Sequence, residues 1–172
     1  ILVDKSEETL DLVRNGELAT DTDGELLSWP VSFGTAVDDG HKQKEGDKRT
    51  PEGLYLYGDY SPYSQYHGSL LLFYPNIDDA EQAFEESRIT RQEREQIVRK
   101  YQRQLPPPMT TDLGGYILVH GTHKKGEMLF PSNVRYLWTD GCVGMSNNDI
   151  DALRVELTLD SAIQMGHILI VP

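Results

Sequence analysis

The sequence predicts a single α+β domain that is mainly β, with a mixed or antiparallel sheet at its core and three peripheral helices. Short apolar runs separated by turn residues are typical of strands. Helical periodicity is confined to residues 77–87, 90–105 and 148–157. No repeat, low-complexity segment or linker divides the 172 residues, so residues 1–172 are expected to form one domain.

Residues 1–37 are expected to form a small meander of strands. Leu10 and Leu12 flank a polar residue, which is typical of a strand with one buried face. The dipeptide Asn15-Gly16 is a strong hairpin signal because both residue types tolerate positive φ. Residues 17–20 would return antiparallel, and a second turn at residues 21–24 would lead into another strand.

The middle of the chain combines a polar loop with two expected central strands. Residues 38–48 are polar and contain glycines, which predicts a surface loop with a solvated His41. Residues 54–57 and 69–74 are apolar on both faces, as in central strands. The loop between them carries Tyr60, Tyr63, Tyr66 and His67. Such rings are expected to pack over a core edge; the alternative is that they line a binding groove.

Capping signals mark the starts of the first two helices. Asn76 can cap one helix, and Thr90 with Glu93 forms a capping box for the next. The second helix would bury one face and end at the three prolines of residues 106–108. That face consists of Ile97, Tyr101 and Leu105. The opposite face is basic and is expected to be solvated; the alternative is that it attracts substrate carboxylates.

In the last third of the chain we expect a strand that ends at a histidine, a third helix and a final strand. Residues 116–119 form an apolar run that predicts a buried strand delivering His120 to its C-terminal end. Ser146 can cap the third helix, and residues 167–171 are expected to close the sheet as the last strand. The residues turned inward by that helix would be Ile150, Leu153 and Leu157.

Composition and charge exclude several classes of function. The net charge of −12 opposes binding to phosphate backbones and anionic membranes, so no nucleic-acid partner is expected. No apolar run approaches the roughly 18 residues of a membrane span. The single cysteine excludes an internal disulfide. No signal segment is recognisable, so an exported protein would already have lost its signal.

Cys142, the only cysteine, lies 22 positions after His120 and 19 after His123. A thiol becomes a nucleophile when a base removes its proton, so a cysteine beside a histidine is the minimum unit of thiol acyl-transfer chemistry. Gly141 and Gly144 allow a tight turn that could point amide N–H groups at one spot, as in an oxyanion hole. A lone cysteine is, however, more often a small buried hydrophobic residue.

The surrounding motifs resemble those of the L,D-transpeptidase catalytic domain (YkuD-like) family. Val119-His120-Gly121 and the segment Thr139-Asp140-Gly141-Cys142-Val143 match its paired motif, and residues 49–55 resemble its T-P-x-G strand. Tyr74-Pro75-Asn76 and residues 146–150 are similar to the branch with murein-processing enzymes of Gram-negative bacteria. Two features depart from the family. Gly144 stands where many members have an Arg or Asn. The interval between the histidine and the cysteine is also longer than in many members, which leaves either His120 or His123 as the base.

The resemblance implies a peptidoglycan-processing enzyme of the periplasm or cell envelope that needs no cofactor and no metal. Cys142 would form a thioester with a stem peptide at the L-centre of its diaminoacid. The resemblance makes His120 the base and the Gly121 carbonyl the group that orients its ring, with His123 as alternative base or substrate-facing residue. Amides of Gly141 and Cys142 would form the oxyanion hole. The substrate loop would comprise Thr139, Asp140 and Gly144.

The fate of the thioester separates the remaining alternatives. Transfer to an amine makes a transpeptidase, whereas water makes an L,D-carboxypeptidase or an amidase that frees a murein-linked lipoprotein.

Two other classes of function form no thioester. One is a metal hydrolase, in which His120 and His123 would be joined by a third ligand, either His67, His167 or Asp112. The HxxH pattern, however, lacks the helical spacing of HExxH. The third class is a catalytically idle wall-binding module.

Overall fold

The computed structural model describes residues 1–36, 40–122, 139–159 and 165–172. Within them, the main sheet has eight strands in the order β5-β2-β1-β10-β6-β7-β8-β9. Their bounds are β1 Leu2–Asp4, β2 Thr9–Asp11, β5 Ser28–Pro30, β6 Gly53–Ser61, β7 Ser69–Leu72, β8 Leu118–His120, β9 Val143–Gly144 and β10 Gly166–Val171. The sheet is mixed, because β1 with β10 and β8 with β9 are parallel pairs. The predicted class, α+β and mainly β, is confirmed.

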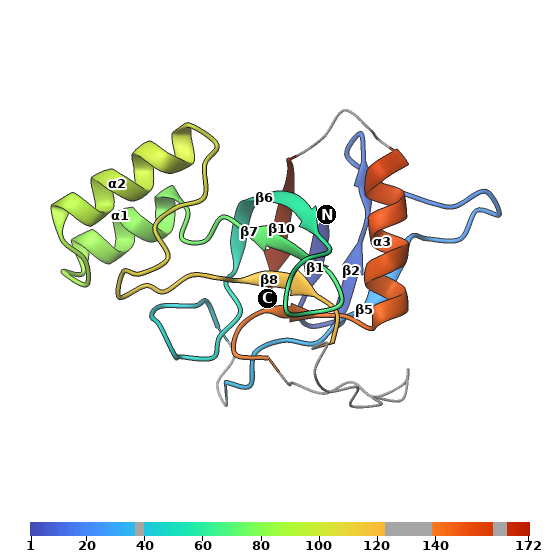
Figure 1. The fold of residues 1–172 in the computed structure, drawn as a ribbon, viewed down its shortest axis with the longest axis horizontal. Helices are drawn as coiled ribbons and strands as arrows, with labels where there is room; N and C mark the ends of the chain where they lie inside the picture. Colours follow the sequence, from blue (N-terminus) through green and yellow to red (C-terminus); the bar gives the residue numbers. More distant parts are fainter. Residues whose placement is uncertain (37–39, 123–138, 160–164) are drawn as a thin grey trace.

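Three helices flank this sheet in the described part of the chain: α1 (Ile77–Glu85), α2 (Arg91–Gln102) and α3 (Asn147–Leu159). In Figure 1 the α1–α2 pair lies to one side of the strands and α3 to the other. The α1–α2 pair has a small core of its own, and α3 buries Ile150 and Leu153 in the main core. The prediction of three peripheral helices is therefore confirmed.

The capping signals predicted for the first two helices both form. The Asn76 side chain accepts from the Asp79 N–H at 2.9 Å, and Thr90 and Glu93 make the reciprocal capping box. Helix α2 ends at Gln102, before the prolines, so Leu105 lies outside it and is 39% exposed. The expected burial of Leu105 is thus wrong, because the helix stops one turn short of it.

The predicted hairpin is present as a separate two-stranded ribbon, β3 (Val13–Arg14) with β4 (Glu17–Leu18). Asn15 and Gly16 have φ of 56° and 85°, as the tight turn requires. The predicted C-terminal strand is present as β10, which lies inside the sheet between β1 and β6. Strands from the two ends of the chain therefore hydrogen-bond to each other.

Two local predictions are corrected. His41 is not solvated: its Nδ1 accepts from the Glu52 N–H at 3.0 Å, and its Nε2 lies 3.0 Å from Asp79 Oδ1. The loop it belongs to is anchored, because buried Lys42 binds Asp47 at 2.8 Å. Tyr116 is also outside the expected strand, with φ of 55° and a 67% exposed side chain; the strand begins at Leu118.

Candidate active site

The candidate site lies where strands β8 and β9 run side by side. Val119 pairs with Val143 and His120 with Gly144, in parallel. Cys142 immediately precedes β9, and the backbone N–H of Leu118 donates to its Sγ at 3.4 Å. The pairing therefore brings the only cysteine and His120 to neighbouring strands at one edge of the sheet.

A tight turn holds Cys142. Gly141 has φ of +124°, and a Cβ there would lie 2.6 Å from the Arg49 carbonyl oxygen, so only glycine fits. The buried Thr139 hydroxyl donates to the Cys142 carbonyl at 2.7 Å and accepts from the Gly141 N–H at 3.2 Å. Thr139 therefore closes the turn, and the Gly141 amide, expected at an oxyanion hole, is already hydrogen-bonded in this structure.

The thiol is half-buried beside the segment that leads into β8. Sγ lies 3.6 Å from the Tyr116 carbonyl oxygen, to which it can donate. Burial raises the pKa of Cys142 to about 11, although the Leu118 N–H acts in the opposite direction by stabilising a thiolate. At neutral pH Cys142 is accordingly a protonated thiol.

The imidazole of His120 is 1% exposed. Its Nδ1 donates to the Gly121 carbonyl at 2.6 Å, which assigns the proton to Nδ1 and the lone pair to Nε2. Burial lowers the pKa of His120 to about 4, and the bond to Gly121 opposes that shift only in part. At neutral pH His120 is thus an uncharged base.

Tyr66, from the loop between β6 and β7, covers the imidazole. The two ring centroids are 3.7 Å apart and the planes differ by 24°, which is a stacked arrangement. Burial raises the pKa of Tyr66, and a negative charge on the nearby Cys142 thiolate or Asp140 carboxylate raises it further. The aromatic composition of the loop was the one sequence signal for Tyr66, and it could not say which ring meets the histidine.

Helix α3 supports the site from behind. Asn147 Oδ1 accepts from both the backbone N–H and the hydroxyl of Thr122, at 2.9 and 3.0 Å. The same oxygen would lie 2.7 Å from a Cβ at Gly121, so the helix packs closely against the His-Gly pair. His67 Nε2 lies 2.8 Å from Asp151 Oδ2 of α3. Sequence reasoning did not assign these supporting contacts.

The other predicted site residues are placed differently. Asp140 is exposed, with its carboxylate 3.9 Å from Lys48 Nζ. Gly144 lies in β9 and exchanges hydrogen bonds with Ser32, so it belongs to the sheet and not to the turn. His123 lies outside the described residues.

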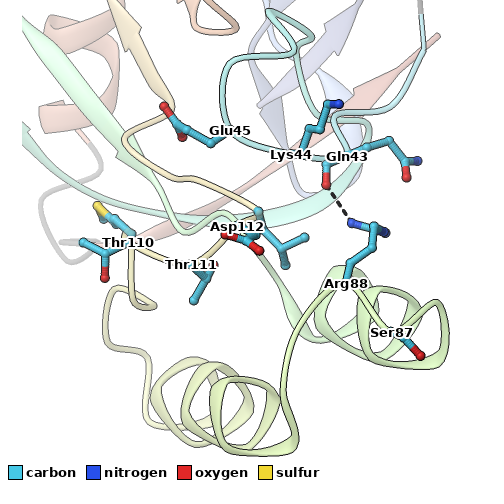
Figure 2. A pocket seen from close by; sticks show the side chains of 10 residues that line it. Gln43, Lys44, Glu45, Ser87, Arg88, Thr110, Thr111 and Asp112 are labelled. Carbon is cyan, nitrogen blue, oxygen red and sulfur yellow. Dashed lines mark hydrogen bonds between the residues drawn. The ribbon is translucent and has the colours of Figure 1, made fainter.

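A separate pocket of about 670 Å³ opens between the α1–α2 pair and the loop before β8 (Figure 2). Arg88 on its wall donates from Nη1 to the Gln43 carbonyl at 2.6 Å. None of the residues predicted for the thiol site lines it, although Asp112, a candidate ligand in the metal-hydrolase alternative, does. The described ranges contain no group of three or more metal-ligating side chains, and no helix among them is long and apolar enough to span a membrane.

This β-rich domain places a thiol just before β9 and a buried imidazole at the end of the neighbouring parallel strand β8, and these are the two groups that thiol acyl-transfer enzymes use. The family model for the L,D-transpeptidase catalytic domain (YkuD) matches residues 1–163, and the chain belongs to that family. Members are cysteine-dependent enzymes that act on peptidoglycan. No curated protein sequence matches the chain significantly.

The fold is shared with solved structures of one protein. The helical cell shape determining protein Pgp2 from Campylobacter jejuni is 19% identical with a TM-score of 0.62, and a single-residue variant of it gives the same values. Bd1075 from Bdellovibrio bacteriovorus is 21% identical with a TM-score of 0.47. In all three the match covers 99% of this chain but only 45–46% of the other, so the chain spans less than half of their length.

Proposed function

We propose that this chain is an L,D-transpeptidase that forms a thioester between Cys142 and a peptidoglycan stem peptide at the L-centre of its diaminoacid, and then passes the acyl group to an amine. Its membership of a family that acts on peptidoglycan supports the substrate. The parallel pairing of β8 with β9 carries the proposal, because it sets the thiol beside the strand that ends in His120. The enzyme would act in the periplasm or cell envelope, where this substrate lies.

The proposed mechanism uses His120 Nε2 as the base. The Cys142 sulfur attacks the scissile carbonyl while its proton moves to Nε2. The resulting imidazolium donates that proton to the leaving amine as the C–N bond breaks, which leaves the thioester. An incoming amine then attacks the thioester, loses a proton to His120, and expels the thiolate, which is reprotonated. The Gly121 carbonyl keeps Nδ1 protonated throughout.

The raised pKa of Cys142 and the lowered pKa of His120 favour a concerted proton transfer over a preformed thiolate–imidazolium pair. Burial holds Cys142 as a thiol and His120 as a neutral imidazole near pH 7, so the charged thiolate–imidazolium pair is disfavoured before substrate binds. The carbonyl carbon of the bound substrate then accepts electron density from the sulfur while the thiol proton moves to His120 Nε2. His123 remains the alternative base.

We assign the oxyanion contact chiefly to the Cys142 backbone N–H. The Gly141 N–H would contribute only by sharing its hydrogen with the Thr139 hydroxyl, because it already donates there at 3.2 Å. One such amide donor is typically worth about 3 kcal/mol of transition-state stabilisation. Thr139 and Asp140 would act by shaping the loop beneath the substrate, whereas Gly144 is held in β9.

Incubation of purified muropeptides with wild type and Cys142→Ala, with products read by mass, tests the proposal. We expect crosslinked dimers with wild type and none with Cys142→Ala. Shortened stems, or release of a murein-linked lipoprotein, would instead identify the same thioester hydrolysed by water. Identical products from both proteins would refute thiol catalysis, and loss of activity to a chelator but not to iodoacetamide would identify a metal hydrolase.

The choice of base is tested separately by His120→Gln and His123→Gln in the same assay. We expect the first to lose about a hundredfold or more in turnover, which is the usual contribution of a positioned base. His167→Gln is the matched control, because it removes an exposed histidine from β10. Loss of turnover in His123→Gln alone would transfer the role to His123.

A further inference from the structure

Tyr66 lies where it can act on both reactive groups. Its ring is stacked on the His120 imidazole at 3.7 Å, and its phenol lies within the electrostatic influence of Cys142. The adjacent His67 is anchored twice, through its N–H to the Thr122 carbonyl at 2.9 Å and through Nε2 to Asp151. The loop that carries Tyr66 is therefore fastened to β8 and α3 on either side of the site.

Two contacts fix the imidazole in complementary directions. The Nδ1 bond to the Gly121 carbonyl lies in the ring plane and restricts rotation within that plane. The stack with Tyr66 covers one ring face and restricts tilting out of the plane. Loss of the stack would remove the restraint on that ring face, and displacement of a catalytic group by about 1 Å can cost a hundredfold in rate.

The same stack keeps water from the imidazole. His120 is 1% exposed, whereas Cys142, which precedes the neighbouring strand β9 and lies beside Leu118, is only half-buried. A covered ring face removes part of the hydration that would stabilise an imidazolium. Other titratable side chains on the surrounding elements are His67 on the same loop, Asp140 in the turn and Asp151 on α3.

We propose that Tyr66 is the positioning residue of the Cys142–His120 pair, and that its ring holds the imidazole plane and shields it so that Nε2 stays unprotonated and directed at the thiol. This inference rests on the proposed function for the roles of Cys142 and His120. The aromatic ring is the active part, so phenylalanine should replace tyrosine at this position.

The test compares Tyr66→Ala, Tyr66→Phe and wild type. Tyr63→Ala is the matched control, because Tyr63 lies in the same loop and is 95% exposed. The pKa and tautomer of His120 are measured by NMR of the imidazole nitrogens, assigned with His120→Gln. The rate of Cys142 alkylation by iodoacetamide is followed against pH, and turnover of muropeptides is measured last.

We expect Tyr66→Ala to raise the pKa of His120 by about one unit or more, toward the value of a solvated imidazole. The acid limb of the alkylation profile should move to higher pH by the same amount, and turnover should fall about tenfold or more with KM little changed. Tyr66→Phe and Tyr63→Ala should keep the wild-type profile. If Tyr66→Ala does not fold, Tyr66→Leu, which keeps an apolar cover without a ring, should show a smaller shift in the same direction.

A Tyr66→Ala protein that keeps the wild-type pKa, tautomer and alkylation profile would overturn the proposal, and so would a Tyr66→Phe protein as impaired as Tyr66→Ala. The NMR and alkylation measurements need no peptidoglycan. They therefore succeed or fail independently of the proposed substrate, and inactivity of wild type toward muropeptides would count against the proposed function alone.

Discussion

At the scale of single residues, burial sets the protonation of the two reactive groups. The imidazole of His120 loses hydration that would stabilise its charged form, and the Cys142 thiol loses hydration that would stabilise the thiolate. Both groups are therefore uncharged at neutral pH. In the proposed mechanism, the thiol loses its proton to His120 only as the sulfur attacks the carbonyl carbon of the substrate, so proton transfer and attack are coupled.

The buried imidazole also predicts how stability depends on pH. The pKa of His120 is lowered from 6.5 to about 4 in the folded protein, so between these values the unfolded chain binds the additional proton. Its contribution to stability is complete above pH 6.5 and is lost as pH falls to 4. We expect wild type to lose on the order of 3 kcal/mol more than His120→Gln over this range, measured by urea unfolding.

The control for this measurement is His167→Gln, which removes an exposed imidazole and should leave the wild-type loss in place. Equal pH dependence of stability in wild type and His120→Gln would show that His120 titrates alike in the folded and unfolded chains.

At the scale of elements, helix α3 is the support behind the His-Gly pair. The face of α3 that is turned toward the core buries Ile150 and Leu153. Asn147, in the first turn, accepts a hydrogen bond from the Thr122 N–H. The start of the helix is fixed by Ser146, whose hydroxyl accepts from the Asp149 N–H at 3.1 Å and donates to the Asp149 carboxylate at 2.6 Å. A change at this cap should therefore reach the site through Asn147.

Ser146→Ala removes that cap and should lower the free energy of unfolding by about 1 kcal/mol, as measured in urea. Thr158→Ala is the matched control, because Thr158 is an exposed hydroxyl residue at the other end of the same helix. A Ser146→Ala protein as stable as Thr158→Ala would show that the cap contributes nothing.

At the scale of the whole molecule, the sheet is held together by its last strand. β10 pairs in parallel with β1 and antiparallel with β6, and thereby joins the N-terminal meander to the half of the sheet that carries the site. Ile168 and Ile170 point into the core at 0% and 1% exposure. Loss of packing in β10 should consequently destabilise both halves together.

Ile170→Ala should cost about 2–5 kcal/mol in the free energy of unfolding, the range for a truncated core aliphatic residue. The neighbouring Leu169 is 40% exposed, and Leu169→Ala should cost less than about 1 kcal/mol in the same denaturant titration. Similar losses for the two variants would mean that β10 is not packed as a central strand.

Local chemistry explains which features the sequence predicted. The hairpin at Asn15-Gly16 and the caps at Asn76 and Thr90 depend on a few neighbouring residues, so their patterns were readable in the chain. The motifs around His120 and Cys142 likewise identified the family to which the chain belongs. The end of α2 and the start of β8 were misplaced because apolar spacing does not mark where an element stops.

The sequence by itself determined the class of fold, the capped helices and the two residues that could form a thiol–imidazole pair. Only the tertiary structure decided that β10 lies within the sheet, that His41 is anchored to Asp79, and that Tyr66 covers His120. The physical reason is one of range. Caps and turns are made by residues a few positions apart, whereas the pairing of β10 and the contacts of His41 with Asp79 and of Tyr66 with His120 join residues more than 35 positions apart that meet only when the chain is folded.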